Sequence, residues 1–236
     1  GVLRFRFPQS RLPLAAAGAS GTLPTRPDTH LECLVMSPGS GAPRRCRWAE
    51  RSDWERDYHD SEWGTPLHED KKLFEFLLLE GAQAGLSWVT ILKKRAAYRE
   101  AFDHFEPERV AAFGDAQVDS LMQNPGIIRN RLKIQAAVKN ARAFINVAED
   151  FGSFDSYVWR FVDGMPILGC WPDDASVPVS SPESQALSLD LGQRGFGFCG
   201  PVICYSYMQA IGMVNDHTAR CFRFPALKDE FNPYNQ

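Results

Sequence analysis

Apolar residues recur along the chain with the spacing of helices, and this pattern predicts the secondary structure. Between residues 73 and 78, four apolar side chains repeat at i, i+1, i+4 and i+5, which places them on one helical face. Asp70 is expected to cap this helix at its start. Ser87 is expected to cap a second helix, over residues 88–98.

Further helices are expected on both sides of a turn at 124–131. Pro107 opens a short helix, Asp115 precedes another, and a long apolar stripe runs from about Asn130 to Ala148. The remaining predictions are helices at 153–162, 182–192 and 202–211, and a long loop at 164–181. No stretch alternates with period two, so the predicted fold class is all-α, with eight to ten helices.

Residues 1–45 depart from this pattern, because they contain many prolines and no periodicity, and we expect them to be disordered. Six arginines and two acids give them the composition of a transit peptide. The alternative, which we favour, is that translation begins at Met36, since residues 11–18 would form a poor amphipathic helix. The expected parts are an extension at 1–44, a domain at 45–225 and a C-terminal tail at 226–236.

The composition is that of a soluble globular protein, with 44% hydrophobic and 23% charged residues and no apolar run of membrane-spanning length. Beyond residue 45 the chain carries 20 basic and 27 acidic residues, a net charge of −7. An acidic body is unusual for a nucleic-acid binder, so any DNA contact must use a local basic patch. We expect no membrane partner.

Cysteine and histidine positions suggest a metal site. The six cysteines are irregularly spaced, which favours a reduced cytosol over a disulfide framework. His217 and Cys221 are four apart, and on a helix they would share one face. With Cys46 and His59 they make a Cys2His2 set suited to tetrahedral zinc, with no position left for water, so the ion would be structural. The alternative is that all four are ordinary buried residues.

Several aromatic residues lie on either side of Glu80 in the sequence, and the helical pattern does not show whether the Glu80 side chain is buried or exposed. Residues 48–63 contain four aromatic residues, Trp48, Trp54, Tyr58 and Trp63, and Trp88 follows Glu80 by eight residues. The rings could be plain core, or a cage that sandwiches a flat, electron-poor ring. Glu80 follows three leucines, so it faces solvent or is buried for a purpose.

The turn at 124–131 contains Gly126 between two predicted helices, and a turn of this kind presents backbone N–H groups to a phosphate. Arg129, Arg131 and Lys133 add positive charge beside it. This is the form of a helix-hairpin-helix element, which holds DNA without reading its sequence. A generic connection between two helices is the alternative.

Six segments in order resemble the 3-methyladenine DNA glycosylase I family, over residues 44–224. They are RCRW at 45–48, YHDSEWG at 58–64, LEGAQAGLSW at 79–88, GIIRNR at 126–131, RGFGF at 194–198 and VNDH at 214–217. The resemblance implies two helical lobes with a lesion pocket between them, a helix-hairpin-helix element and a structural zinc ion. One departure is the run at 191–193, where the family often carries more basic residues.

The same resemblance implies a role for each site residue. Zinc would be held by Cys46, His59, His217 and Cys221. Glu80 would be catalytic, with Tyr58 and Trp88 on the base and Trp48 and Trp63 as pocket walls. The phosphate-binding hairpin would comprise Gly126, Ile127, Arg129 and Arg131, and the loop from Gln83 to Ser87 would enter the duplex, with Leu86 filling the emptied stack.

The implied activity is hydrolysis of the N-glycosidic bond of flipped-out 3-methyladenine in alkylated double-stranded DNA, which leaves an abasic site. We expect a monofunctional enzyme that acts as a monomer in the cytoplasm, with organelle import as the alternative. Three rival functions remain. They are a non-catalytic zinc-containing binder of damaged DNA with the same fold, a zinc-dependent hydrolase of small molecules, and a helical interaction module.

Overall fold

The computed structural model describes residues 43–230, and within them the protein is mostly helical, as predicted. Predictions for residues 1–42 and 231–236, including nearly all of the N-terminal extension, lie outside this range. The α-helices are α1 (Asp53–Ser61), α2 (Asp70–Gln83), α3 (Trp88–Ala101), α4 (Pro107–Ala111), α5 (Asp115–Gln123), α6 (Arg131–Phe151), α7 (Phe154–Trp159), α8 (Pro182–Gln193), α9 (Pro201–Ala210) and α10 (Arg223–Glu230). Short 3-10 helices are η1 (Arg47–Arg51), η2 (Asp103–Phe105), η3 (Arg160–Val162) and η4 (Asp174–Ser176).

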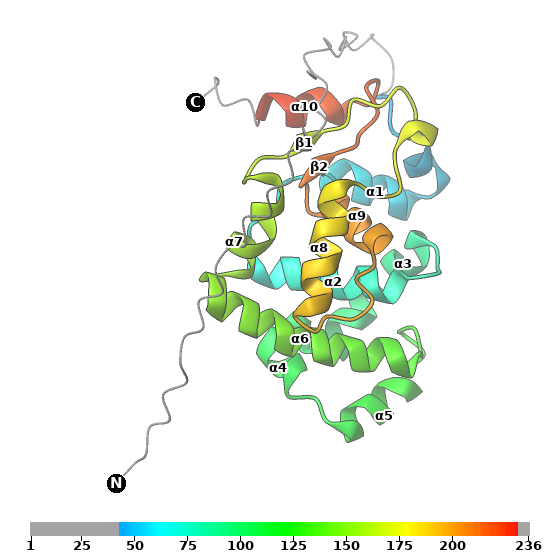
Figure 1. Ribbon diagram of the computed structural model, residues 1–236. Coiled ribbons are helices and arrows are strands. Elements are labelled where there is room, and N and C mark those ends of the chain that lie inside the picture. Colours follow the sequence, from blue (N-terminus) through cyan, green and yellow to red (C-terminus); the bar gives the residue numbers. More distant parts are fainter. Residues whose placement is uncertain (1–42, 231–236) are drawn as a thin grey trace, which may run out of the picture. The chain divides into compact units, whose positions relative to one another are not determined.

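Helix α2 lies at the centre of the described residues and packs against α3, α6, α7 and α9. Every residue from Leu73 to Ala82 is buried, including two glutamates. Helix α6 packs against α2, and α4 and α5 pack against α6 (Figure 1). A helix enclosed on all sides has no polar face, so its apolar pattern cannot show which way a given side chain points.

The upper part of Figure 1 holds α1, α10 and a small parallel sheet. Strands β1 (Ile167–Leu168) and β2 (Val214–Asn215) pair in register, Ile167 with Val214. The sequence analysis predicted a loop at 164–181 and no strands, because two-residue strands are too short to show an alternating pattern. The pairing fixes the start of the segment that carries His217.

Most predicted helix starts agree with the structure, but the role of Asp70 does not. Asp70 is the first residue of α2, and its carboxylate accepts the backbone N–H groups of Phe154 and Asp155 at 2.9 and 2.8 Å. It therefore caps the start of α7 rather than its own helix. The predicted boundary at residue 225 falls inside α10, where Leu227 is buried.

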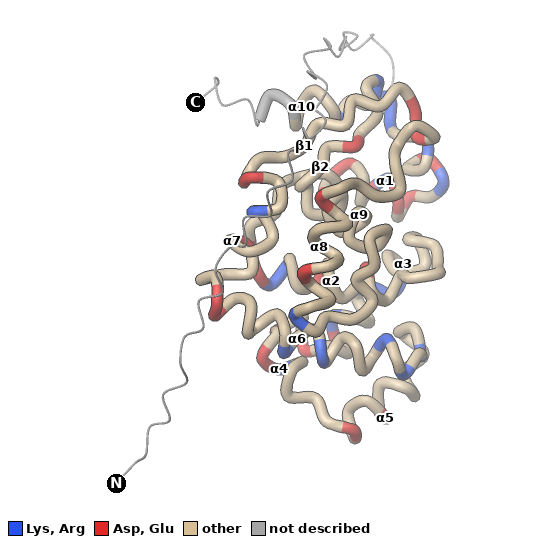
Figure 2. The backbone as a smooth tube through the Cα atoms, viewed as in Figure 1, with Lys and Arg blue, Asp and Glu red and all other residues tan. Residues whose placement is uncertain are grey.

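Basic and acidic positions are mixed along most of the chain, and several basic ones gather where α5 leads into α6 (Figure 2). In the part of the chain that the structure describes, we find no helix of the length and apolarity that crossing a bilayer requires.

Candidate active site and metal centre

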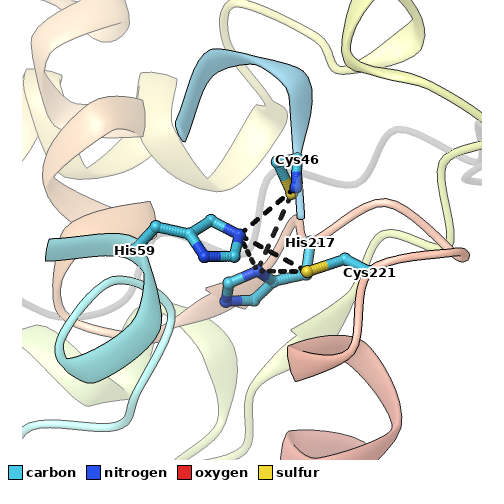
Figure 3. A group of neighbouring side chains, drawn as sticks. All are labelled: Cys46, His59, His217 and Cys221. Carbon is cyan, nitrogen blue, oxygen red and sulfur yellow. Dashed lines mark hydrogen bonds between the residues drawn. The ribbon is translucent and has the colours of Figure 1, made fainter. Parts of the chain in front are cut away.

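Two cysteines and two histidines converge in a buried cluster (Figure 3). Cys46 precedes η1, His59 lies on α1, and His217 and Cys221 follow β2. Cys46 Sγ lies 3.8 Å from His217 Nδ1, which lies 3.2 Å from His59 Nε2. Cys221 Sγ lies 3.4 Å from His59 Nε2 and 3.5 Å from His217 Nδ1.

These distances fit one tetrahedral zinc ion. Bonds of about 2.3 Å to sulfur and 2.0–2.1 Å to nitrogen place neighbouring ligand atoms roughly 3.3–3.8 Å apart. The four donor atoms lie within 4.8 Å of one another and all four residues are buried. The cluster can therefore hold a metal ion through four protein ligands.

The outer nitrogen of each histidine has an acceptor, which leaves the inner nitrogen unprotonated. His59 Nδ1 donates to Asp60 at 2.8 Å, and Asp60 is held in turn by the Arg45 guanidinium. His217 Nε2 donates to the carbonyl oxygen of Trp63 at 3.0 Å. Such outer contacts orient imidazole ligands toward a metal and raise their basicity.

The turn between β2 and α10 places Cys221 beside His217. The expectation that these two residues share a helical face was wrong, because the segment between them is irregular. A hydrogen bond from the Cys46 thiol lowers the pKa of the Cys221 thiol, against the opposing effect of burial. Gly64 allows the close packing, since a Cβ there would lie 2.9 Å from His217 Nε2.

Four aromatic rings form a continuous row from α3 to the metal cluster. The ring centres of Trp88 and Tyr58 are 5.4 Å apart, those of Tyr58 and Trp48 are 6.4 Å apart, and those of Trp48 and Trp63 are 5.0 Å apart. Trp63 also packs edge-on against His217. The structure thus brings together four of the five aromatic residues that the sequence singled out, whereas Trp54 is 53% exposed and lies outside the row.

Glu80 lies in the middle of α2 with only 4% of its surface exposed. Burial raises the pKa of its carboxyl to about 8. Its negative charge also contributes to raising the pKa of Tyr58, after the larger effect of burial. The Nε1–H of Trp88 is buried without an acceptor among the described residues. An unpaired buried donor on Trp88, whose ring packs against Tyr58, and a buried carboxyl on α2 are groups that can recognise a polar ring.

The loop after α2 exposes Leu86 beside this site. Leu86 is 38% exposed, and its carbonyl oxygen accepts a bond of 2.7 Å from the Gln83 amide. Gly85 has φ +78, a backbone conformation that favours glycine. Ser87, the predicted cap of α3, is the N-cap residue by position, but its hydroxyl bonds to Thr90 Oγ1 instead.

Three backbone N–H groups at the centre of the turn before α6 already have acceptors. Gly126 donates to Asn124 Oδ1 at 2.8 Å, Ile127 to the Asn124 carbonyl at 3.5 Å, and Ile128 to Tyr98 Oη at 3.1 Å. The Ile127 side chain is buried, so only its backbone can reach a phosphate. A phosphate would have to displace these partners.

The arginines of the turn differ in their pairing. Arg129 is exposed and forms no ion pair within the described residues, whereas Arg131 is paired with Asp119 at 2.6 Å. Lys133 donates to carbonyl oxygens rather than facing solvent. Of the three cations, Arg129 is therefore the one most available to DNA.

Two surface cavities lie apart from this site. One, of about 460 Å³, is lined by η1 and the 172–175 segment, and the other, of about 430 Å³, by charged residues of α2 and α3. Neither is lined by Glu80, Tyr58 or Trp88, so we assign the candidate site from the side chains and not from cavity size.

The described residues thus form a helical fold that holds a row of aromatic rings and a buried carboxyl on its central helix, α2. Residues 48–224 match the methyladenine glycosylase family. The chain belongs to this family.

Curated relatives and solved structures agree with that assignment. The chain is 47% identical to DNA-3-methyladenine glycosylase 1 of Escherichia coli, over 78% of this chain and 98% of the relative. It is 46% identical to DNA-3-methyladenine glycosylase of Haemophilus influenzae, over 75% and 96%. A crystal structure of 3-methyladenine DNA glycosylase I, 49% identical, superposes with a TM-score of 0.74 over 76% and 98% of the two chains.

A further structure concerns recognition of 3-methyladenine by 3-methyladenine DNA glycosylase I of Staphylococcus aureus. It is 38% identical, with a TM-score of 0.75 over 78% of this chain and 98% of that one. The resemblance drawn from the six sequence segments is confirmed at the level of the family.

Proposed function

We propose that this protein is a DNA glycosylase that releases 3-methyladenine from alkylated double-stranded DNA by hydrolysis, leaving an abasic site. Two relatives that this chain matches over almost their whole length are named for this activity. The observation that carries the proposal in this chain is the buried Glu80 carboxyl on α2, which acts electrostatically on Tyr58, while the Tyr58 ring packs against that of Trp88.

Recognition would use the contrast between a charged and a neutral base. N3-methylation gives adenine a positive charge, which weakens its glycosidic bond and its pairing, so flipping the nucleotide out costs less. Trp88 would stack on the flipped ring while Glu80 accepts hydrogen bonds from it. A cation in contact with the carboxyl lowers its pKa and restores the anion that burial disfavours.

The chemical step needs little acid catalysis. The N9–C1′ bond breaks, the electron pair stays on the base and neutralises its charge, and water adds its oxygen to C1′ and loses a proton. The Glu80 anion would stabilise positive charge that develops on the sugar. We infer a monofunctional enzyme, so strand breaks should form only after alkali is added to the product.

We propose that Cys46, His59, His217 and Cys221 hold a structural zinc ion. The support is the ligand spacing, the burial and the outer hydrogen bonds of the two histidines. When bound, zinc would join η1 and α1 to the segment before α10 and supply no open position for catalysis.

We further propose that the fold comprises two helical lobes and that α5, the turn and α6 form a helix-hairpin-helix element. Gly126, Ile127, Arg129 and Arg131 would hold the DNA backbone, and the loop from Gln83 to Ser87 would enter the duplex with Leu86. Exposed Arg129 and exposed Leu86 support these roles. We place the glycosylase domain from residue 45 to the end of α10, because Leu227 of that helix is buried. We also propose that the protein is a monomer in the cytoplasm, with the chromosome.

The experiment is release of 3-methyladenine from methylated duplex DNA, comparing wild type with Glu80→Gln and with Glu149→Gln, an exposed carboxylate on α6. We expect Glu80→Gln to reduce excision about 100-fold or more, and Glu149→Gln to leave it unchanged. No base release by the wild type, with tight binding to methylated DNA, would favour a non-catalytic damage binder instead. Wild-type excision by Glu80→Gln would remove Glu80 from the mechanism.

A further inference from the structure

Lys133 connects the helix after the turn to the loop that carries Leu86. Its ammonium donates to the carbonyl oxygens of Ala82 at 2.8 Å and Ala84 at 2.6 Å, where α2 ends. Its backbone N–H donates to Asn130 Oδ1, the side chain that caps α6. Lys133 therefore lies at the start of α6 and also bonds to Ala84 at the end of α2, 49 residues away in the sequence.

The carbonyl oxygens at the end of a helix lack partners within the helix and carry partial negative charge. Ala84 leaves the helix with ψ 115, and the chain turns sharply at Gly85. The Lys133 ammonium satisfies two carbonyls at the start of this turn, while Gln83 holds the carbonyl of Leu86 at its far side. The position of the loop thus depends on a contact from α6.

We propose that Lys133 is a positioning residue that sets the loop entering the duplex relative to the turn that grips the DNA backbone. The inference rests on the proposed function, since it concerns how two DNA-contacting segments act together. It departs from the expectation that Lys133 offers its charge to a phosphate. Two of its three donors are taken by carbonyl oxygens of its own chain.

The reason for such a contact is geometric. The turn before α6 fixes where the protein sits along the duplex, and Leu86 must enter the stack where the damaged nucleotide leaves it. A displacement of about 1 Å between interacting groups can cost roughly 100-fold in rate. A lysine whose ammonium reaches from one segment to the other keeps that separation constant before DNA binds.

The test compares Lys133→Met, which keeps the alkyl stem, with Lys139→Met, which removes an exposed charge from the same helix. Three quantities are measured: the single-turnover rate of base release from methylated duplex, the salt dependence of duplex affinity, and the affinity for free 3-methyladenine from tryptophan fluorescence. For Lys133→Met we expect a rate roughly 10- to 100-fold lower. The salt slope and the free-base affinity should stay at wild-type values, and Lys139→Met should excise at the wild-type rate.

A Lys133→Met variant that excises at the wild-type rate overturns the proposal. So does a salt slope that falls by about one, because that is the signature of a lost phosphate contact. If the Met variant does not fold, Lys133→Arg carries the test. Its planar head should displace the loop and lower the rate, and an unchanged rate overturns the proposal. A wild type that releases no base refutes the proposed function and not the role of Lys133.

Discussion

The Arg95 guanidinium donates to the Glu75 carboxylate at 2.7 Å, and this contact joins the helix that carries Trp88 to the helix that carries Glu80. Glu75 is buried, and it also accepts from Arg99 at 3.1 Å. Arg95 in turn reaches Glu62, just beyond the end of α1. The three helices that position the aromatic rings and the carboxyl are thus held by one network of charges.

Glu75→Gln should lower the free energy of unfolding by about 2 kcal/mol, because it removes the buried carboxylate that two guanidinium groups share and leaves Arg95 with Glu62 alone. Glu62→Gln is the matched control, since Glu62 pairs with the same arginine but its side chain is 38% exposed, against 5% for Glu75. It should cost within about 1 kcal/mol. Urea denaturation of both variants checks this, and equal losses would contradict it.

Removing the metal should loosen the fold at the cluster. Cys221→Ser should lose bound zinc and with it the stability that zinc binding adds to the folded state. Its Tm should fall by about 10 °C or more, at roughly 2–4 °C for each kcal/mol of stability lost. A strong chelator should have the same effect on the wild type. Cys204→Ser is the control, because Cys204 is also buried but lies outside the cluster. Metal analysis and calorimetry give the readout, and an unchanged zinc content in Cys221→Ser would refute the assignment.

The helices could be predicted from the sequence because their caps and apolar stripes are local. Ser153 caps α7 and Asn130 caps α6, both close to the predicted starts. The role of Asp70 could not be read locally, since its carboxylate serves a helix 84 residues further on. Strand pairing of two residues each also leaves no period in the sequence.

In the candidate site, too, some features could be predicted from the local sequence and others could not. The burial of Glu80 could not be decided from periodicity, because all of α2 from Leu73 to Ala82 is enclosed. The four residues of the cysteine and histidine cluster could be chosen by residue type, although the segment from His217 to Cys221 is a turn and not the expected helix. The contacts of Lys133 and Arg95 carried no signal, since a lysine or arginine on a helix usually faces solvent.

Burial of Glu80 should make stability depend on pH. Its pKa in the folded protein is about 8, raised from 4.5 by burial. Between these values the folded state holds a proton that the unfolded state has lost, so stability falls as pH rises. Glu80→Gln lacks this penalty and should become progressively more stable than wild type from pH 5 to pH 8, by ~1.4 kcal/mol per pH unit at most. The free energy of unfolding of both proteins is measured by denaturation at each pH. A difference between them that stays constant from pH 5 to pH 8 would contradict the raised pKa of Glu80.

The same carboxyl should shape the pH dependence of excision, with opposite sign. The anion is the form that binds a cationic base, so kcat/KM, which reports the free enzyme, should rise with pH and level off near pH 8. Once the charged base is bound, its field lowers the pKa of the Glu80 carboxyl, so the single-turnover rate at saturating enzyme should level off at lower pH. The measurement is both profiles on methylated duplex, corrected for spontaneous depurination. A kcat/KM that is flat from pH 6 to pH 8 would mean that the ionisation of Glu80 does not control recognition of the charged base.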